Sequence, residues 1–407
     1  YRRQRQMCIR DRIKGLKVAT VSCGLGLGKK PDLMLTELRP GSKISALFTR
    51  SSLSAAPVKW CKSFIAKGEV RYILANSVCA NACTGKSGSY AVNRIADSLV
   101  RFSGCRRNQI FFASTGLIGE KLQYKKIISS LPGLFKKLGS SDRGWREAAR
   151  SILTTDTCVK ISSTTVRVGS RVARISAFAK GAGMIQPNLA TMLAFIYTDL
   201  AIPLPVMRRL LVDSCDQSFN LITVDGDTST NDTVFFSSTG TVAPSRRIKS
   251  YGDPILSNFK AQLRKVTLDL ARQIVLDGEG SKKFVTIRVG GASTKKSAKK
   301  IALSIANSSL VKTAIAGGDA NWGRIAMAIG KSGEQVNSNK IKISIGKIIL
   351  MNHGQGVSDK NTKLANRYMA GKEITIDVDV GLGKEKSVIW TCDLTKDYVR
   401  INAHYRS

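Results

Sequence analysis

Acidic residues and histidine are scarce in this sequence. Asp and Glu number 28 against 65 Lys and Arg, which gives a formal net charge of +37 over 407 residues. Only two histidines are present, His353 and His404. Two histidines offer few ligands for a zinc site and few candidate bases for a Ser–His triad. We therefore expect chemistry that uses neither histidine nor a bound metal.

Long apolar runs and regularly spaced cysteines are also missing. No uninterrupted apolar stretch reaches the roughly 20 residues that a membrane-spanning helix needs. The nine cysteines are an odd number without regular spacing, which favours a reducing compartment. Residues 1–13 are rich in Arg, lack the apolar core of a secretory signal, and are predicted to be a basic appendage outside the fold. We expect a cytoplasmic protein without a membrane partner, rather than a mitochondrial one.

Aromatic residues make up only 6% of the chain, and this bears on the meaning of the positive charge. A field of this size attracts nucleic acid, anionic lipid or acidic metabolites. The basic residues are nevertheless spread along the chain as doublets, such as Lys125-Lys126 and Lys299-Lys300, without a basic tail or an interleaved aromatic ladder. A lysine-rich solvated surface is therefore favoured over a nucleic-acid-binding face, which usually concentrates its charge.

Short apolar runs and helical periods follow one another along the chain without a strict βαβ order. Strands are predicted at residues 17–23, 33–38, 45–50, 70–77, 109–113, 164–180, 283–289, 311–316, 341–350 and 374–380, and at the start of residues 218–233. Helices are predicted at 91–102, before residue 153, after Pro203, and at 255–276 and 297–306. This mixture predicts an α+β fold of packed layers more than a doubly wound sheet.

The run CGLGLGKK at residues 23–30 has the glycine content of a phosphate-binding loop. Cys23 occupies the place of the first glycine, and Lys30 stands where Ser or Thr would bind magnesium. A glycine-rich turn between two strands is therefore predicted here.

Small polar residues follow the strand predicted at 109–113. Thr115 and Gly116 lie there, and such residues leave backbone N–H groups free to point into a cavity, as an oxyanion hole requires. A simple turn from strand to helix is the alternative. A second cluster of Ser, Thr, Asp and Asn within 218–233 is expected to cap helices or form turns, and could equally line a polar site.

The stretch from residue 180 to residue 199 organises the rest of the chain. The small residues from Gly181 to Gly183 permit a sharp turn that can hold a strained peptide bond. A Thr191 hydroxyl placed after that turn can attack the preceding carbonyl, and the amino terminus so freed can act as the base for the same hydroxyl. Spacing alone favours the simpler interpretation, a glycine turn leading into a core strand.

Five separated blocks together resemble the ornithine acetyltransferase family of arginine biosynthesis, from about residue 14 to the last residue. The blocks are ANACTG at 80–85, STGLIGE at 114–120, KGAGMIQPNLATMLAF at 180–195, SFNLITVDGDTSTNDT at 218–233 and KTAIAGGDANWGR at 312–324, with RINAHYRS at the end. In this order they are highly specific. They reverse the preference for a simple glycine turn before residue 191.

The resemblance implies a layered αββα-type sandwich like that of self-processing enzymes with an N-terminal nucleophile. A smaller C-terminal α/β lobe is expected from about residue 283. The resemblance also implies self-cleavage between Ala190 and Thr191, which divides the chain into an α chain, residues 14–190, and a β chain, residues 191–407. Two α and two β chains are expected to form a heterotetramer.

The reaction that the resemblance implies is a ping-pong acetyl transfer. Thr191 takes the acetyl group of N2-acetyl-L-ornithine, and L-glutamate then accepts it to form N-acetylglutamate. No coenzyme or metal is needed, although some members also use acetyl-CoA as acetyl donor. By resemblance, Thr115 and Gly116 stabilise the oxyanion. The substrate contacts carry over to Thr154, Lys180, Thr191, Glu279, Asn402 and Ser407.

The chain departs from the family pattern at two places. The family commonly has Gly-Asn where Val78-Cys79 stand, and an acidic residue and a proline where Gly318 and Ala320 stand. Neither departure touches the nucleophile or the oxyanion donors. Two other functions stay open, a related self-processing aminopeptidase or amidase and, on the charge alone, a basic nucleic-acid-binding protein.

Overall fold

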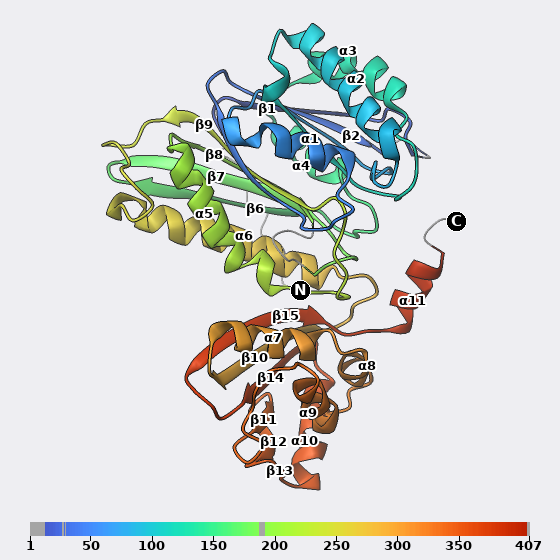
Figure 1. Cartoon of the computed structure of the whole chain (residues 1–407), viewed down its shortest axis with the longest axis vertical. Helices are drawn as coiled ribbons and strands as arrows, with labels where there is room; N and C mark the ends of the chain where they lie inside the picture. The colour runs from blue at the N-terminus through green and yellow to red at the C-terminus, as the bar shows by residue number, and fades with distance from the viewer. Residues whose placement is uncertain (1–12, 27, 29, 187–191, 405–407) are drawn as a thin grey trace. The chain divides into compact units, whose positions relative to one another are not determined.

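The computed structural model describes residues 13–26, 28, 30–186 and 192–404, and their contacts divide the chain into two compact units (Figure 1). Unit 1 takes the described residues within Tyr1–Gly181, Pro187–Asn220 and Thr228–Ala271, and unit 2 those within Ala182–Gln186, Leu221–Asp227 and Arg272–Ser407. The calls on Ala190, Thr191 and Ser407 lie outside the described residues.

The first sheet of unit 1 has the strand order β1-β2-β4-β5. Its strands are β1 (Leu16–Val21), β2 (Leu33–Leu38), β4 (Tyr72–Asn76) and β5 (Ile110–Ser114). Only β4 and β5 run parallel. The helices that pack on this sheet are α1 (Ala56–Phe64), α2 (Gly85–Ser103), α3 (Tyr124–Lys137) and α4 (Asp142–Ser151).

The second sheet of unit 1 has the strand order β3-β9-β8-β7-β6. Its strands are β3 (Lys43–Phe48), β9 (Thr233–Val242), β8 (Leu193–Leu200), β7 (Arg171–Lys180) and β6 (Lys160–Val168). Helix α5 (Leu204–Asp216) packs on β3, and α6 (Ser257–Leu276) reaches β6, where the Thr164 hydroxyl donates to Gln262 Oε1 at 3.2 Å.

The two sheets of unit 1 pack face to face. The hydroxyls of Thr36 on β2 and Tyr197 on β8 are 3.3 Å apart, and the rings of Phe111 on β5 and Phe235 on β9 lie 6.0 Å apart between centroids. Every residue of β8 is buried, as expected for a strand covered on both faces. Helices thus cover the outer faces of two stacked sheets, which confirms the predicted α+β class and its αββα layering (Figure 1).

Unit 2 is built on one six-stranded sheet of order β13-β12-β11-β14-β10-β15. Its strands are β10 (Phe284–Ala292), β11 (Lys342–Ile345), β12 (Ile348–Asn352), β13 (Gln355–Gly356), β14 (Glu373–Asp379) and β15 (Glu385–Cys392). Its helices are α7 (Lys295–Ala306), α8 (Ser309–Gly317), α9 (Trp322–Gly330), α10 (Asp359–Met369) and α11 (Lys396–Ala403). The core lies between α7 and strands β10 and β15.

Two predicted strands are wrong. Residues 311–316 belong to helix α8, because the Ser308 hydroxyl accepts the Val311 N–H as an N-cap and Gly318, at φ +73°, ends the helix. A short apolar run does not by itself distinguish a buried strand from a buried helix. The start of 218–233 forms a 3₁₀ helix, Phe219–Leu221, and not a strand. The other 3₁₀ helices of the described residues are Ile65–Lys67, Arg107–Gln109 and Pro254–Leu256.

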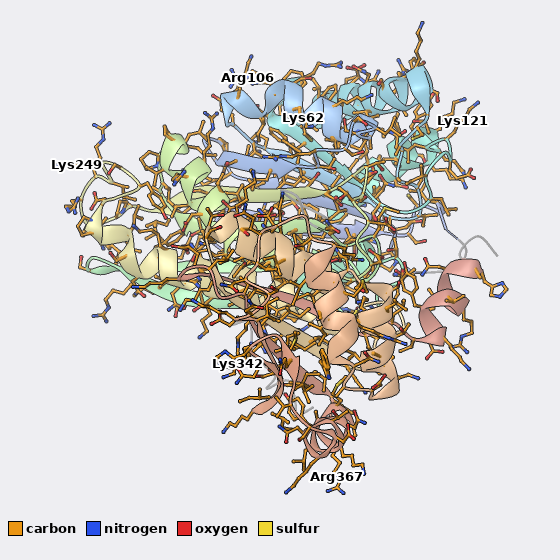
Figure 2. All side chains as sticks on the ribbon, turned by 60° about the horizontal axis from the view of Figure 1, so that its bottom comes forward. Lys62, Arg106, Lys121, Lys249, Lys342 and Arg367 are labelled. Carbon is orange, nitrogen blue, oxygen red and sulfur yellow. The ribbon has the colours of Figure 1, made fainter. Side chains whose placement is uncertain are left out.

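Exposed basic side chains stand on many different elements (Figure 2). Figure 2 labels Lys62, Arg106, Lys121 and Lys249 in unit 1, and Lys342 and Arg367 in unit 2, all of them exposed. Because these residues come from helices, loops and a strand alike, no single element carries the positive charge. Within the described ranges, none of the helices is both long and apolar enough for a membrane span.

Candidate functional site

The loop after β5 presents two hydrogen-bond donors. The backbone N–H of Thr115 is not free as the sequence suggested, because it donates to the Asn76 carbonyl at 3.0 Å. The Thr115 hydroxyl and the Gly116 N–H have no hydrogen-bond partner among the residues that the structure describes. Both groups can therefore donate to a developing oxyanion.

Gly116 is required by its close approach to a neighbouring loop. Its φ is +127°, and a Cβ at this position would lie 2.1 Å from both the carbonyl carbon and the oxygen of Val78. Leu117 N–H donates to the Val78 carbonyl at 2.8 Å, so the two loops are joined by backbone. Val78 itself has φ +76°, a costly angle for a β-branched residue, at the position where the resembling family commonly has glycine.

Asn231 fastens the polar cluster of residues 218–233 to these loops. Its side-chain amide donates to the carbonyls of Ala80 at 2.6 Å and Ser114 at 2.8 Å. The neighbouring hydroxyl of Thr230 donates to the Asn231 side-chain oxygen at 2.6 Å. The described part of the cluster therefore joins these loops through backbone carbonyls, as expected of residues that form turns.

Lys180 and Thr154, two predicted substrate contacts, lie together in unit 1. The Lys180 ammonium at the end of β7 donates to the Thr154 hydroxyl at 3.1 Å. The Thr154 N–H donates to the Asp156 carboxylate at 3.2 Å. A cation and a hydroxyl are thus held side by side, an arrangement that suits a carboxylate ligand.

Asp156 and Lys160 form a fully buried ion pair that the sequence did not single out. Their side chains are 0% exposed, and Lys160 Nζ lies 2.7 Å from Asp156 Oδ1. The Gly181 N–H donates to the same oxygen at 2.6 Å. Burial alone raises the pKa of Asp156, but the charges of Lys180 and Lys160 outweigh burial and lower this pKa below its usual value. Asp156 is therefore a carboxylate.

Asp232 is a second buried acid close to Lys180. It is 2% exposed, and its Oδ2 has no hydrogen-bond partner among the described residues. Burial raises the pKa of Asp232 well above its usual range, although the Lys180 charge and hydrogen bonds from Ser229 oppose the shift. One ammonium thus has two buried acids within its electrostatic reach, and their pKa values are shifted in opposite directions.

Glu279 and Asn402, the next two predicted contacts, are joined in unit 2. The Asn402 side-chain amide donates to Glu279 Oε2 at 2.7 Å, and Glu279 is 8% exposed. The Glu279 N–H donates to the Ala182 carbonyl at 2.9 Å. A Cβ on Gly183 would lie 2.5 Å from the Glu279 carboxyl group. The small residue at 183 is thus needed for the close approach of Glu279.

Asp225 holds the chain after this glycine. Its carboxylate accepts the N–H groups of Met184 at 2.6 Å and Ile185 at 2.8 Å. The Tyr398 hydroxyl donates to the same carboxylate at 3.4 Å. Burial and the nearby charges of Asp225 and Glu279 raise the pKa of the Tyr398 phenol, which stays a neutral donor.

The described residues of the glycine-rich run, 23–26, 28 and 30, belong to neither β1 nor β2 and lie between the two strands, as predicted. The Asp32 carboxylate accepts the N–H groups of Cys23 at 2.7 Å and Leu25 at 2.8 Å, so an internal carboxylate takes the place that a phosphate would need. Lys30 instead donates to the Leu153 carbonyl at 3.0 Å, next to the predicted substrate contact at residue 154. This contact between Lys30 and Leu153 was not predicted from the sequence.

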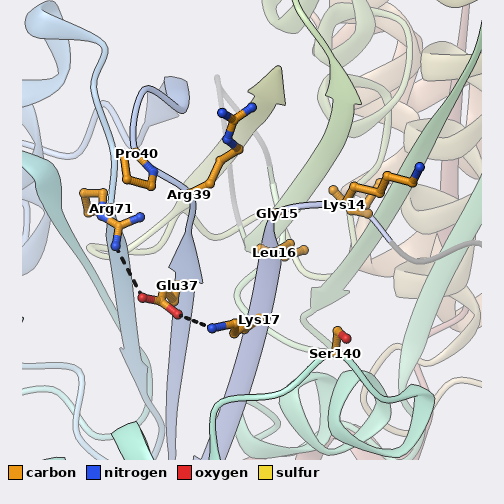
Figure 3. Close-up of a pocket in the computed structure, with 10 residues that line it drawn as sticks. Lys14, Gly15, Leu16, Lys17, Glu37, Arg39, Pro40, Arg71 and Ser140 are labelled. Carbon is orange, nitrogen blue, oxygen red and sulfur yellow. Dashed lines mark hydrogen bonds and ion pairs between the residues drawn. The ribbon is translucent and has the colours of Figure 1, made fainter. Parts of the chain in front are cut away.

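Unit 1 also has a basic surface pocket of about 510 Å³ that contains none of the predicted site residues. Figure 3 shows Lys17 and Arg71 both reaching Glu37, each with a nitrogen 3.3 Å from a carboxylate oxygen. Arg39 and Lys14 line the same pocket. Among the described residues, no group of three or more His, Cys, Asp or Glu side chains could hold a metal ion.

Comparison with known proteins decides the family. The sequence model of the ArgJ family matches residues 17–407. The chain belongs to the ArgJ family. The "Arginine biosynthesis bifunctional protein ArgJ" of Gluconobacter oxydans is 42% identical over 395 residues, which are 97% of this chain and 92% of that protein. The ArgJ protein of Mesorhizobium japonicum is 43% identical over 397 residues, 97% of this chain and 96% of its own length.

One solved structure is similar to part of the chain. The crystal structure of the ArgJ protein from Bacillus halodurans is 39% identical, covers 51% of this chain and 97% of its own, and has a TM-score of 0.46. The family match confirms the resemblance that the five sequence blocks indicated. In this ArgJ chain hydrogen bonds join Lys180 to Thr154 and Asn402 to Glu279, and the predicted residues that the structure describes are divided between the two units. Thr115, Gly116, Thr154 and Lys180 lie in unit 1, and Glu279 and Asn402 in unit 2.

Proposed function

We propose that this chain is a glutamate N-acetyltransferase of arginine biosynthesis, which moves the acetyl group of N2-acetyl-L-ornithine to L-glutamate. The ArgJ family match over residues 17–407 carries the proposal. The curated relatives, which match 97% of the chain, are named bifunctional proteins of arginine biosynthesis. Acetylation of glutamate by acetyl-CoA is the second activity in the proposal, and neither reaction calls on a resident metal or coenzyme.

In the proposed mechanism, Thr191 carries the acetyl group between the two substrates. Its hydroxyl attacks the acetyl carbonyl, ornithine leaves with the transferred proton on its amine, and an acetyl-threonine ester remains. The amine of glutamate then attacks this ester and releases Thr191. Each step passes through an oxyanion, and the Thr115 hydroxyl and the Gly116 N–H are donors with no other partner in the described part of the chain.

The proposed cleavage between residues 190 and 191 leaves two chains that share one sheet. Strand β7 of the α chain pairs with β8 of the β chain, from Ile175↔Thr198 to Lys180↔Leu193. Strand β3 of the α chain pairs with β9 of the β chain over six residue pairs. Two ladders of backbone hydrogen bonds therefore hold the α and β chains together after cleavage.

We further propose that two α and two β chains assemble in the cytoplasm. A native mass equal to two copies of the 44.1 kDa precursor would support the assembly, and the mass of one copy would contradict it. None of the eight cysteines within the described residues forms a disulfide with another, which supports a reducing compartment.

Each unit, taken by itself, offers a charged group of a kind that amino-acid substrates require. Lys180, beside the Thr154 hydroxyl, supplies the cation that a substrate carboxylate requires. Glu279, beside the Asn402 amide, supplies the anion that an ammonium group requires. Charge-assisted hydrogen bonds of this kind are about twice as strong as neutral ones.

The decisive assay incubates the purified protein with N-acetylornithine and glutamate, with and without acetyl-CoA. We expect N-acetylglutamate and ornithine in equal amounts without acetyl-CoA. Release of acetate into water in place of transfer to glutamate would favour the aminopeptidase or amidase alternative. Tight nucleic-acid binding that weakens steeply as salt rises would favour the third alternative, a basic nucleic-acid-binding protein. Only the net charge of +37 suggests this alternative.

Glu279→Gln is expected to lower kcat/KM for N-acetylornithine by about 10- to 100-fold, the effect of losing one hydrogen bond to a charged group. Gln keeps the oxygen that accepts from Asn402, so the local contact is preserved and only the charge is lost. Steady-state kinetics at several substrate concentrations measure the effect. Glu385→Gln, an exposed acid at the start of β15, should leave kcat/KM unchanged, and equal losses in both variants would contradict the assignment.

Gly116→Ala is expected to lower kcat by about 100-fold, because the added methyl group collides with the Val78 carbonyl and displaces the donor loop. Gly119→Ala is the matched control. Gly119 also has a left-handed φ, +89°, but its Cβ would meet no atom within 4 Å. Both variants therefore carry a similar backbone cost, and only Gly116→Ala should lose activity in the steady-state assay. Equal kcat values for the two variants would show that the position of this loop is unimportant.

A further inference from the structure

Residues 184–186 are held in place one after another, shortly before the proposed cleavage site. Met184 is 41% exposed and has φ +56°, in the left-handed region that a residue with a side chain enters only at a cost. Strained backbone angles persist only where the surrounding structure holds them, and they cluster at functional sites. The groups that hold Met184 are therefore candidates for a role in the reaction.

The Asp225 carboxylate is the group that holds Met184. Its Oδ2 accepts the Met184 N–H at 2.6 Å, and its Oδ1 accepts the Ile185 N–H at 2.8 Å. Two successive N–H groups that point at one anion are the arrangement of an anion-binding nest, which a left-handed residue makes possible. Hydrogen bonds to a charged acceptor are about twice as strong as neutral ones. The carboxylate therefore offsets the cost of the Met184 angle.

The residues before Asp225 connect it to the sheet of unit 2. Val224 donates its N–H to the Ile185 carbonyl at 2.7 Å. Thr223 in turn donates its N–H to the carbonyl of Trp390 on β15 at 3.0 Å. A functional group supported by a sheet is placed more precisely than one on an unsupported loop. Asp225 therefore binds residues 184 and 185 from a fixed position.

The chain on each side of the proposed scissile bond is held within its own unit. On the upstream side, the Asn307 side-chain amide donates to Gln186 Oε1 at 2.7 Å. On the downstream side, the Thr233 N–H donates to the Met192 carbonyl at 2.9 Å. In the sequence, Gln186 stands four residues before Ala190. The last described contacts before the scissile bond are therefore those of residues 184–186.

Self-cleavage requires the Thr191 hydroxyl to meet the carbonyl of residue 190. The hydroxyl attacks this carbonyl, its proton passes to the amide nitrogen, and the C–N bond breaks to leave an ester. Water then hydrolyses the ester to a carboxylate at residue 190 and restores the hydroxyl beside a free amine at residue 191. Such an attack needs the two atoms about 3–3.5 Å apart, and a misplacement of about 1 Å can cost about 100-fold in rate. An anchored chain reaches this geometry more often, because the entropy of a flexible segment grows with its length.

We propose that Asp225 is a positioning residue for self-cleavage: its carboxylate fixes residues 184 and 185 and so sets the course of the chain toward the scissile bond. The proposal rests on the proposed function, in which the chain cuts itself before Thr191. Asp225 acts through the backbone of Met184 and Ile185, and the proposal requires no contact between its carboxylate and the reacting atoms.

The test follows cleavage of the freshly made, full-length precursor. The protein is synthesised in a cell-free translation system, and samples taken over time are separated by denaturing electrophoresis. Asp225→Ala leaves two N–H groups without their acceptor and should slow the appearance of the two product bands by about tenfold or more. Asp225→Glu keeps both carboxylate oxygens and should cleave faster than Asp225→Ala. Cleavage of Asp225→Ala at the wild-type rate would overturn the proposal.

Asp393→Ala is the matched control for the loss of such a carboxylate. Asp393 also lies in unit 2, is 3% exposed, and accepts the successive N–H groups of Lys282 at 2.8 Å and Lys283 at 3.0 Å. Both alanine variants should be less stable to denaturant in the Thr191→Ala background, but only Asp225→Ala should cleave slowly when Thr191 is present. Equal slowing by both variants would show that general destabilisation controls the rate, and it would overturn the proposal.

Met184→Pro breaks the same contact at an exposed position and keeps the proposal testable even if Asp225→Ala does not fold. Proline has no N–H and a fixed φ of about −65°, so it can neither donate to Asp225 nor adopt the angle of Met184. Cleavage should slow by about tenfold or more. The double variant should be no slower than the slower single variant, because both changes remove one contact. Cleavage of Met184→Pro at the wild-type rate would overturn the proposal.

Failure of the proposed function gives a different result. A wild-type precursor that stays a single band, or a Thr191→Ala variant that is still cut, would contradict self-cleavage at this residue and the role of Asp225 with it. An unchanged rate in Asp225→Ala, beside a wild type that cuts itself, would contradict only the role of Asp225. The two failures are therefore distinguishable.

Discussion

Thr191→Ala is expected to abolish both self-cleavage and acetyl transfer. Without the hydroxyl, nothing attacks the preceding carbonyl, and no acceptor remains for the acetyl group. In denaturing electrophoresis the wild type should give two bands, residues 1–190 and 191–407, and Thr191→Ala a single band of the 44.1 kDa precursor. Acetyl transfer should fall by at least about 10⁴-fold, as it does when the nucleophile of other covalent enzymes is removed.

Two variants separate this role from a general effect of losing a threonine. Thr191→Ser keeps a hydroxyl and should retain cleavage, with reduced activity. Thr198→Ala removes a hydroxyl on β8 that donates to the Arg174 carbonyl at 2.7 Å, and it should still give two bands. Mass spectrometry of protein stopped during turnover should place the added acetyl group on Thr191. An acetyl group on another side chain would contradict the assignment of the nucleophile.

The layered fold was predictable because its signals are local. Alternation within residues 164–180 and the helical period of 255–276 both correspond to elements of the structure, β6 with β7 and α6. The strand predicted from the apolar run at 311–316 was wrong for a physical reason. Its helix is specified by Ser308 and Gly318 at its ends, and the run itself fits a strand equally well.

The site was predictable only in part, because its charges are balanced by residues distant in the sequence. The resemblance indicated Lys180 and Thr154 as substrate contacts. The structure places the Lys180 ammonium nitrogen 3.1 Å from the Thr154 hydroxyl oxygen. Nothing local marked Asp156 as the acid that holds both Lys160 and the chain at residue 181. Asp232 could be identified only as one member of a polar cluster, since its burial depends on strands from three regions of the chain. Pairing in space decides which acid is ionised, and sequence patterns do not contain it.

Asp156→Asn is expected to lower the free energy of unfolding by about 3–5 kcal/mol, because it leaves the buried ammonium of Lys160 without its counter-ion. Both side chains of this pair are 0% exposed, so water cannot solvate the Lys160 ammonium in place of the lost carboxylate. The measurement is denaturant unfolding at pH 7 in the Thr191→Ala background, which is expected to keep the chain in one piece. Asp97→Asn is the control. Its ion pair with Arg107 is about 40% exposed on both sides, and its loss should cost less than about 1 kcal/mol.

The pH dependence of this effect has a definite sign. The folded pKa of Asp156 is lowered, so its contribution to stability is present above the ordinary pKa of an aspartate, about 4, and is lost as pH falls through the lowered value. The stability difference between Asp156 and its Asn variant should therefore shrink in acid. Adding Lys160→Met to Asp156→Asn should recover part of the loss, since the second change removes the unpaired buried charge. Equal destabilisation by Asp156→Asn and Asp97→Asn would mean that burial does not make this pair exceptional, and that Lys180 depends on some other group for its position.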